Sequence, residues 1–130
     1  MEKEKKDLLE AYVKSGITNI LIEGMSAGDF KNCVVIDSKC DISLLNGHYE
    51  DTEFVGPKWY YELLKKDRPV LIINEINSIS KEEQSKFVEI LAYKKISTFE
   101  LPKKCIVIAT CNNLKDMPIN ENVYSLMAHI

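Results

Sequence analysis

Hydrophobic positions along the chain alternate between helical and strand-like spacing. A first helix is predicted over residues 3–15, and it ends before Gly16, a residue that suits the left-handed position after a helix. The apolar residues on one face of this helix are Leu8, Leu9, Tyr12 and Val13. Apolar runs at about 18–23 and 33–37 predict two short strands, whereas the polar stretch 38–54 predicts mostly loop with one short helical turn.

The middle of the chain repeats this alternation. Pro57 stands at a plausible first helical position, and the predicted helix has one apolar face formed by Trp59, Tyr60, Leu63 and Leu64. The run "RPVLIINEI" (68–76) is apolar without interruption until its polar end, which is typical of a parallel strand covered on both faces. Ser80 and Glu83 then form a capping-box pattern before helically spaced apolar residues: Phe87, Ile90 and Leu91.

The last third of the chain contains one more buried-type strand. The run "KKCIVIATCNN" (103–113) is apolar and again ends in polar residues. The segment 119–130 predicts a short helix that presents Val123, Leu126 and Met127. Alternating helices and strands indicate a single α/β domain over residues 1–130 with a mostly parallel central sheet, in which the runs around Ile72 and Val107 are adjacent central strands.

Composition narrows the function classes. A chain of 130 residues with 45% hydrophobic content can form one domain with a core, and a net charge of −3 argues against a broad surface for nucleic acid. The N-terminal "MEKEKKDLLEAY" lacks the apolar centre of a signal peptide, and no apolar run approaches the roughly 18 residues of a membrane span. We therefore expect a cytoplasmic protein that binds neither nucleic acid nor membrane.

The four cysteines do not predict a metal site. No pair has the Cys-x-x-Cys spacing, and neither histidine stands at ligand spacing from a cysteine. Cys33 and Cys105 fall inside apolar runs, where a reduced cysteine usually acts as a small core residue. Cys40 and Cys111 lie at strand ends, where one of them is expected to be exposed, and neither has a neighbouring histidine that would indicate a nucleophile.

The segment from about residue 37 to 113 resembles a known family. The ordered combination of "NEIN", "SKEEQSKFVEIL" and "LPKKCIVIATCN" is similar to AAA+ ATPases, especially the MoxR-like branch, from the Walker B strand to the sensor 1 strand. The preceding segment, in which Gly-Pro opens a helix, also resembles that branch. The resemblance implies an incomplete P-loop NTPase-like sandwich.

Three positions take candidate roles from this resemblance. The Walker B pair, normally Asp-Glu, is here Asn74 and Glu75, so the water-polarising glutamate is present and the magnesium-supporting aspartate is not. Asn112 falls where sensor 1 places a polar residue near the γ-phosphate. From the residues alone, an asparagine after a strand is equally well explained as capping a turn.

The phosphate-binding segment departs most from the family. A working loop reads GxxxxGK followed by Ser or Thr, whereas "EGMSAGDFKN" keeps Gly24 and Gly28 but has Asp29 and Phe30 where the lysine belongs, with Lys31 displaced. The helix that normally follows the loop is missing as well. We expect the first two strands to be antiparallel neighbours, or the second to lie where the family has no strand.

Three interpretations remain open. The first is a degenerate AAA+-like domain that acts as an interaction or scaffold module, whose partner is a related intact subunit or a second copy, and which needs no cofactor. The second is an ATPase subunit that binds ATP and magnesium with help from a partner, although no arginine follows Arg68 to act as an arginine finger. The third is an unrelated α/β domain, which the strand order of the sheet would distinguish.

Overall fold

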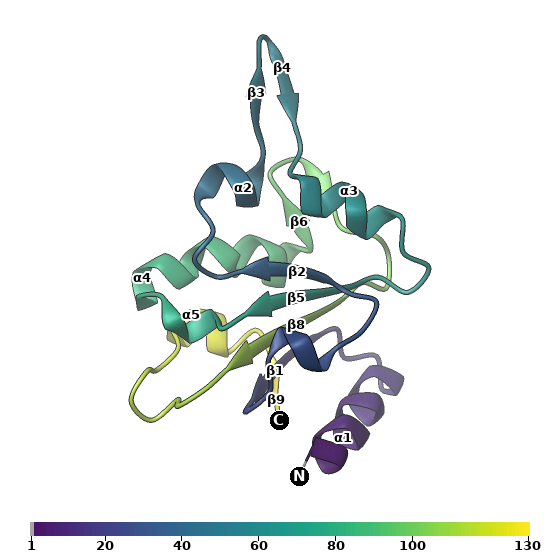
Figure 1. Ribbon diagram of the computed structural model, residues 1–130, viewed down its shortest axis with the longest axis vertical. Coiled ribbons are helices and arrows are strands. Elements are labelled where there is room, and N and C mark those ends of the chain that lie inside the picture. Colours follow the sequence, from purple (N-terminus) through teal and green to yellow (C-terminus); the bar gives the residue numbers. More distant parts are fainter. Residues whose placement is uncertain (1) are drawn as a thin grey trace.

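A parallel sheet forms the centre of the computed structural model, which describes residues 2–130 (Figure 1). The five strands lie in the order β2, β5, β8, β1, β9, and all neighbouring pairs are parallel. Their bounds are β1 (Asn19–Glu23), β2 (Val34–Asp37), β5 (Val70–Asn74), β8 (Ile106–Cys111) and β9 (Ala128–His129). The prediction of an α/β fold with a mostly parallel central sheet is confirmed.

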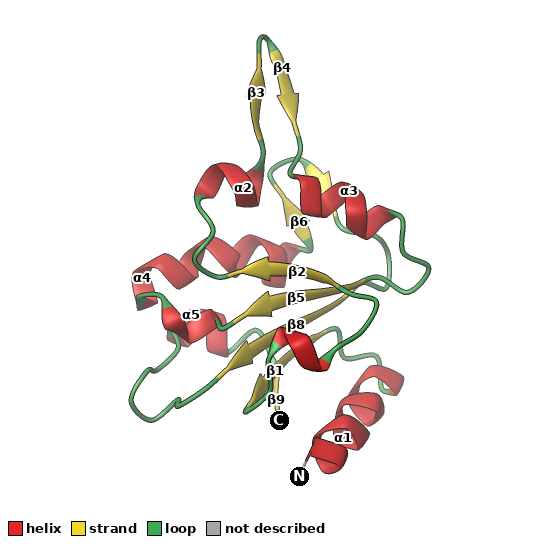
Figure 2. Ribbon diagram, in the orientation of Figure 1, coloured by secondary structure: helices red, strands yellow, loops and turns green. Residues whose placement is uncertain are grey.

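Helices surround this sheet, and two short hairpins extend from it (Figure 2). The α-helices are α1 (Glu2–Lys14), α2 (Ile42–Asn46), α3 (Lys58–Leu64), α4 (Lys81–Gln84) and α5 (Glu121–Tyr124). The 3₁₀ turns are η1 (Ala27–Asp29), η2 (Ile76–Ser78) and η3 (Ser85–Phe87), and η4 (Glu89–Tyr93) is a π-helical turn. The hairpins pair β3 (His48–Glu50) with β4 (Glu53–Val55), and β6 (Lys95–Ile96) with β7 (Phe99–Glu100).

The two faces of the sheet are covered unequally. Side chains alternate between faces along each strand, so Leu71 and Ile73 point to one face and Ile72 to the other. The first face packs against α2, α3, η3, η4 and α5 and forms the larger core. The second face packs against α1, the connections before and after β1, and Ile130, and its buried cluster is smaller.

The central strands are those that the sequence predicts. Strand β8 lies between β5 and β1, and Ile72 stands beside Ile108 in the β5–β8 register. Ile72 is fully buried and Ile108 nearly so. The helix faces are less accurate, because Leu8, Val13 and Leu64 were expected in the apolar faces but are 38–50% exposed.

The expectation that β1 and β2 are antiparallel neighbours is wrong. They are parallel, and β8 and β5 lie between them. The ten residues 24–33 connect Glu23 to Val34 through the single turn η1. Three strand spacings of about 4.8 Å and a return of about 15 Å along the short strands need only ~21 Å, whereas ten residues reach about 33 Å. The strands are short enough for a crossover without a full helix.

Three other segments differ from the sequence prediction. The predicted loop 38–54 contains α2 and the hairpin β3–β4, and the predicted C-terminal helix is one turn, α5, followed by the edge strand β9. The predicted helix after Ser80 is present, but its hydrogen bonding changes from α to 3₁₀ to π before Lys94 ends it in a left-handed conformation. Within residues 2–130, no helix is long and apolar enough to cross a membrane.

Candidate functional site

The candidate site lies where three central strands end. In the parallel register, Glu23 of β1 stands beside Cys111 of β8, and the end of β5 follows on the other side of β8. Carboxyl ends of parallel strands meet at one edge of the sheet, which is the usual place for a ligand in an open α/β fold. The segment after β1, Asn74, Glu75 and Asn112 therefore come to the same edge.

Asn74 ties the segment after β1 to the sheet. Its side-chain oxygen Oδ1 accepts a hydrogen bond from the backbone N–H of Ala27 at 3.1 Å. The same oxygen accepts a second bond from Oγ1 of Thr110 at 3.0 Å. An amide oxygen has two lone pairs, and here both are used, so Asn74 keeps no acceptor for a magnesium ion or its water.

Asp29 occupies the donors of the turn that precedes it. Its carboxylate oxygen Oδ2 accepts a hydrogen bond from the backbone N–H of Ser26 at 2.8 Å and lies 3.5 Å from the Ser26 hydroxyl. In a phosphate-binding loop, backbone N–H groups of this kind point at the ligand. In this chain one is bound by Asp29 and another, that of Ala27, by Asn74. Two N–H groups at the start of the η1 turn are thus bound by the protein's own acceptors.

Glu75 has a fixed backbone and an exposed side chain. Its φ of 54° places it in the left-handed region, which costs a residue other than glycine of order 1–3 kcal/mol. Its N–H donates to Thr110 Oγ1 at 2.9 Å, and its carbonyl accepts from the hydroxyls of Ser38 and Ser78 at 2.7 and 2.8 Å. These bonds hold the strained backbone and turn the carboxylate into solvent.

Asn112 is held through its backbone. The side chain of Asn77 donates a hydrogen bond to the carbonyl of Asn112. It donates a second one to the carbonyl of Met117 at 2.8 Å. Asn77 is buried in the turn η2, whereas Asn112 is exposed. The arrangement supports the simpler interpretation of Asn112 as a residue that ends a strand in a turn.

Sequence reasoning missed the three buried polar residues that organise this edge, which are Ser38, Asn77 and Thr110. Each of them forms a hydrogen bond with the backbone of a candidate site residue. Ser38 and Thr110 bond to the backbone of Glu75, and Asn77 bonds to the backbone of Asn112. Their signal in the sequence is weak, because a polar residue at a strand end or in a turn is common.

The remaining loop residues have separate places. Gly24 has a φ of 87°, which favours glycine, and its N–H donates to the Cys111 carbonyl at 2.9 Å. Gly28 lies in η1, where an added Cβ would meet only the Ser26 hydroxyl, at 3.8 Å. Lys31 is not at the strand ends, because it lines a groove on the second face of the sheet. The structure therefore does not bring Lys31 together with Asn74 and Glu75.

Of the two cysteines that the sequence places in the core, only one is buried. Cys105 and Cys111 are buried, and burial raises the pKa of their thiols to about 11 and about 12. Cys33, expected in the core, is half-buried, as is Cys40. Among the side chains that the structure describes, those of residues 3–130, no three His, Cys, Asp or Glu gather closely enough to hold a metal ion.

Comparison of the sequence with protein-family models and with curated proteins finds no match.

Proposed function

We propose that this chain is a degenerate AAA+-like domain that acts by binding protein and does not hydrolyse ATP by itself. Support comes from the resemblance of residues 37–113 to the MoxR-like branch and from the strand order. In that order β8, with the sensor-like Asn112 at its end, lies between β1 and the Walker B-like β5. A phosphate site of this type needs the ends of these three strands to lie at one edge, and this strand order provides that.

The η1 turn provides the observation that supports the proposed loss of nucleotide binding. The N–H groups of Ser26 and Ala27 are bound by Asp29 and Asn74 at 2.8 and 3.1 Å. A triphosphate entering here would have to displace both acceptors and approach the Asp29 carboxylate. Lys5 of α1 reaches this edge, and its Nζ donates to the Glu23 carbonyl. Glu75 then has no bound phosphate or metal to act on.

The protein-binding role is supported by exposed apolar side chains. Leu44, Tyr49 and Tyr93 are 64–71% exposed, although large side chains of this kind gain most from burial. Tyr49 lies in β3 of the projecting hairpin β3–β4, and Leu44 lies in α2, which precedes that hairpin. Partners that fit this proposal are a related AAA+ subunit or a second copy of the chain.

Calorimetric titration with ATP and magnesium tests the proposal. We expect no saturable binding at concentrations up to about 1 mM, which corresponds to less than about 4 kcal/mol of binding free energy. Turnover by the wild type and by Glu75→Gln should both equal background, as should turnover by the matched variant Glu82→Gln, which changes an exposed glutamate on α4. A dissociation constant in the low micromolar range, or turnover that only Glu75→Gln abolishes, would establish an ATPase instead.

A further inference from the structure

The hairpin β3–β4 projects from one end of the molecule and has an acidic tip (Figure 1). Three exposed carboxylates lie within four residues: Glu50, Asp51 and Glu53. Glu50 stands directly opposite Glu53 in the antiparallel register, an arrangement of like charges that destabilises an isolated hairpin. A cationic surface placed against this tip would remove that repulsion.

A row of aromatic rings holds the hairpin to the body. The Tyr49 ring meets Phe54 at 5.1 Å between centroids, Phe54 stacks on Phe99 at 5.9 Å, and Phe99 meets the buried Tyr60 at 5.3 Å. At the hairpin base, a Cβ added to Gly47 would lie 2.3 Å from the Val55 carbonyl oxygen, so only glycine fits. The hairpin is a supported projection that presents Tyr49, 71% exposed, together with its acidic tip.

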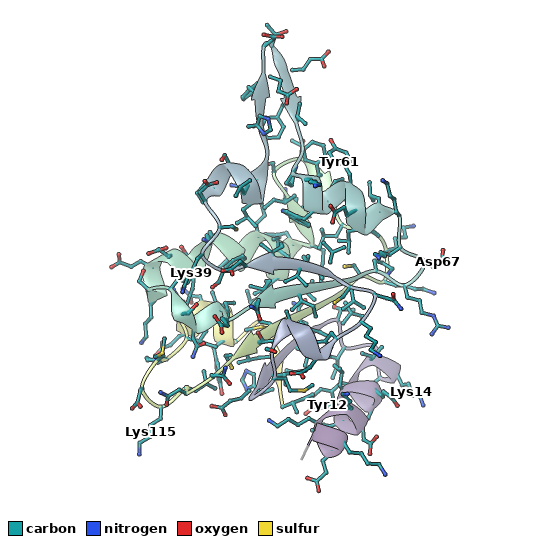
Figure 3. All side chains as sticks on the ribbon, in the orientation of Figure 1. Tyr12, Lys14, Lys39, Tyr61, Asp67 and Lys115 are labelled. Carbon is teal, nitrogen blue, oxygen red and sulfur yellow. The ribbon has the colours of Figure 1, made fainter. Side chains whose placement is uncertain are left out.

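A groove of about 900 Å³ lies on the thinly covered second face of the sheet, between α1 and the start of β5 and β8. Its apolar lining comes from Leu9 and Val13 of α1, Phe30 of the crossover, and Val70, Ile106 and Ile108 of the sheet. Figure 3 shows Lys14 and Asp67, two of the lining residues, on the same side of the molecule. A helix following the phosphate loop would have covered more of this face.

Charged residues around the groove are mostly basic. The cations are Lys14, Lys31, Arg68, Lys103 and Lys104, and the carboxylates are Glu10 and Asp67. Five cations against two carboxylates leave a net of three positive charges, although the whole chain has a net charge of −3. The groove therefore combines an apolar floor with a cationic rim, and the hairpin combines exposed aromatic rings with three carboxylates.

We propose that the β3–β4 hairpin of one molecule binds in this groove of a second copy. Tyr49 then packs on the apolar floor, and the acidic tip faces the basic rim. This inference rests on the proposed interaction role and names its partner. The hairpin and α1 lie toward opposite ends of the long axis, so each copy offers both surfaces to different neighbours (Figure 1).

The resulting assembly is head to tail. Such a heterologous contact forms a ring or an open chain rather than a closed symmetric dimer. One hairpin tip in one groove buries less than the roughly 1,200 Å² of a standard interface, so we expect weak association that needs a high protein concentration. The contact between opposite charges makes association sensitive to salt.

Sedimentation velocity from 10 to 500 μM protein, at 50 and 500 mM NaCl, tests this proposal. The wild type should form dimers and longer species at low salt, with association weakened at least tenfold at high salt. Tyr49→Ser and Glu53→Lys in the hairpin, and Lys103→Glu in the groove, should each remain monomeric. The charge-matched controls Glu82→Lys and Lys115→Glu change exposed residues outside both surfaces and should associate like the wild type.

Mixing the variants tests the head-to-tail geometry. Tyr49→Ser retains a working groove and Lys103→Glu retains a working hairpin, so a mixture should form one-to-one dimers but no longer species. Cys33 lines the groove and provides a second readout. Its alkylation rate, followed by peptide mass spectrometry, should fall with concentration in the wild type but not in Lys103→Glu.

Three results would overturn the inference: a monomeric wild type at 500 μM and low salt, unchanged association in the hairpin or groove variants, or a mixture that stays monomeric. Circular dichroism of each variant verifies that it is folded. None of these outcomes bears on the titration with ATP, which tests the proposed loss of nucleotide binding separately. A monomer that binds no ATP would therefore reject only the hairpin contact.

Discussion

Replacing Thr110 by Val should destabilise the fold more than its small change in shape suggests. Thr110 is buried, with 1% of the residue exposed. Its hydroxyl donates a hydrogen bond to Asn74 Oδ1 at 3.0 Å and accepts one from the Glu75 N–H at 2.9 Å. Valine removes the bond to Asn74, which contributes about 0.5–1.5 kcal/mol, and leaves the Glu75 N–H without its acceptor, which costs about 1–3 kcal/mol. We expect a loss of about 2–4 kcal/mol in the free energy of unfolding.

Urea denaturation measures this loss, with the fluorescence of Trp59, the one tryptophan, as the probe and far-ultraviolet circular dichroism as a second signal. The matched control is Thr110→Ser, which keeps the hydroxyl and removes one methyl group, at a cost of about 1 kcal/mol. If valine costs less than about 1 kcal/mol, or no more than serine, the hydroxyl does not organise this edge and the description of the site is wrong.

Two further predictions concern the sheet and a buried lysine. Ile72→Ala should lower the free energy of unfolding by about 2–5 kcal/mol, because Ile72 is fully buried on the face covered by the crossover; a urea-measured loss below about 1 kcal/mol would mean that β5 is not central. Burial lowers the pKa of Lys94 from 10.5 to about 8. Between these pH values the unfolded state binds more protons than the folded state, so the free energy of unfolding should rise with pH. This rise should be present in the wild type and absent from Lys94→Met. Parallel stability profiles of the two proteins over that range, measured by urea denaturation, would contradict this prediction.

The sheet could be predicted because its strands are apolar on both faces. Long uninterrupted runs such as those around Ile72 and Val107 are typical of central parallel strands, and their adjacency follows from their shared burial. The hairpin β3–β4 could not be found in this way. Its strands are three residues long, its side chains are exposed, and Glu50 facing Glu53 opposes pairing, so its stability depends on contacts with Phe99 about fifty residues away.

The crossover between β1 and β2 shows a different limit. The rule that parallel strands need a dozen or more connecting residues assumes strands of ordinary length and a helix on the face of the sheet. Here β2 has four residues and β1 five, so the return path is short. The same rule predicts that no full helix fits between β1 and β2, and the ten connecting residues contain only the turn η1.

The candidate site was predicted as a set of positions, but its internal bonding was not. The sequence brings Asn74, Glu75 and Asn112 to the ends of parallel strands, and the structure places them there. The sequence does not reveal that Asn74 accepts hydrogen bonds from Ala27 and Thr110, because these residues are 47 and 36 positions away in the chain. Buried polar groups are satisfied by whatever the tertiary fold brings near them.

Asparagine at position 74 fits the proposed loss of phosphate binding. An aspartate there would add a second carboxylate beside Glu75 and near the turn that contains Asp29, with no magnesium ion to balance it. Asparagine accepts the same two hydrogen bonds without the charge. Asp29 in turn supplies the acceptor of the Ser26 N–H. Both side chains therefore bind N–H groups of the segment after β1 with acceptors inside the protein, which supports our proposal that this edge does not hold a metal–phosphate complex.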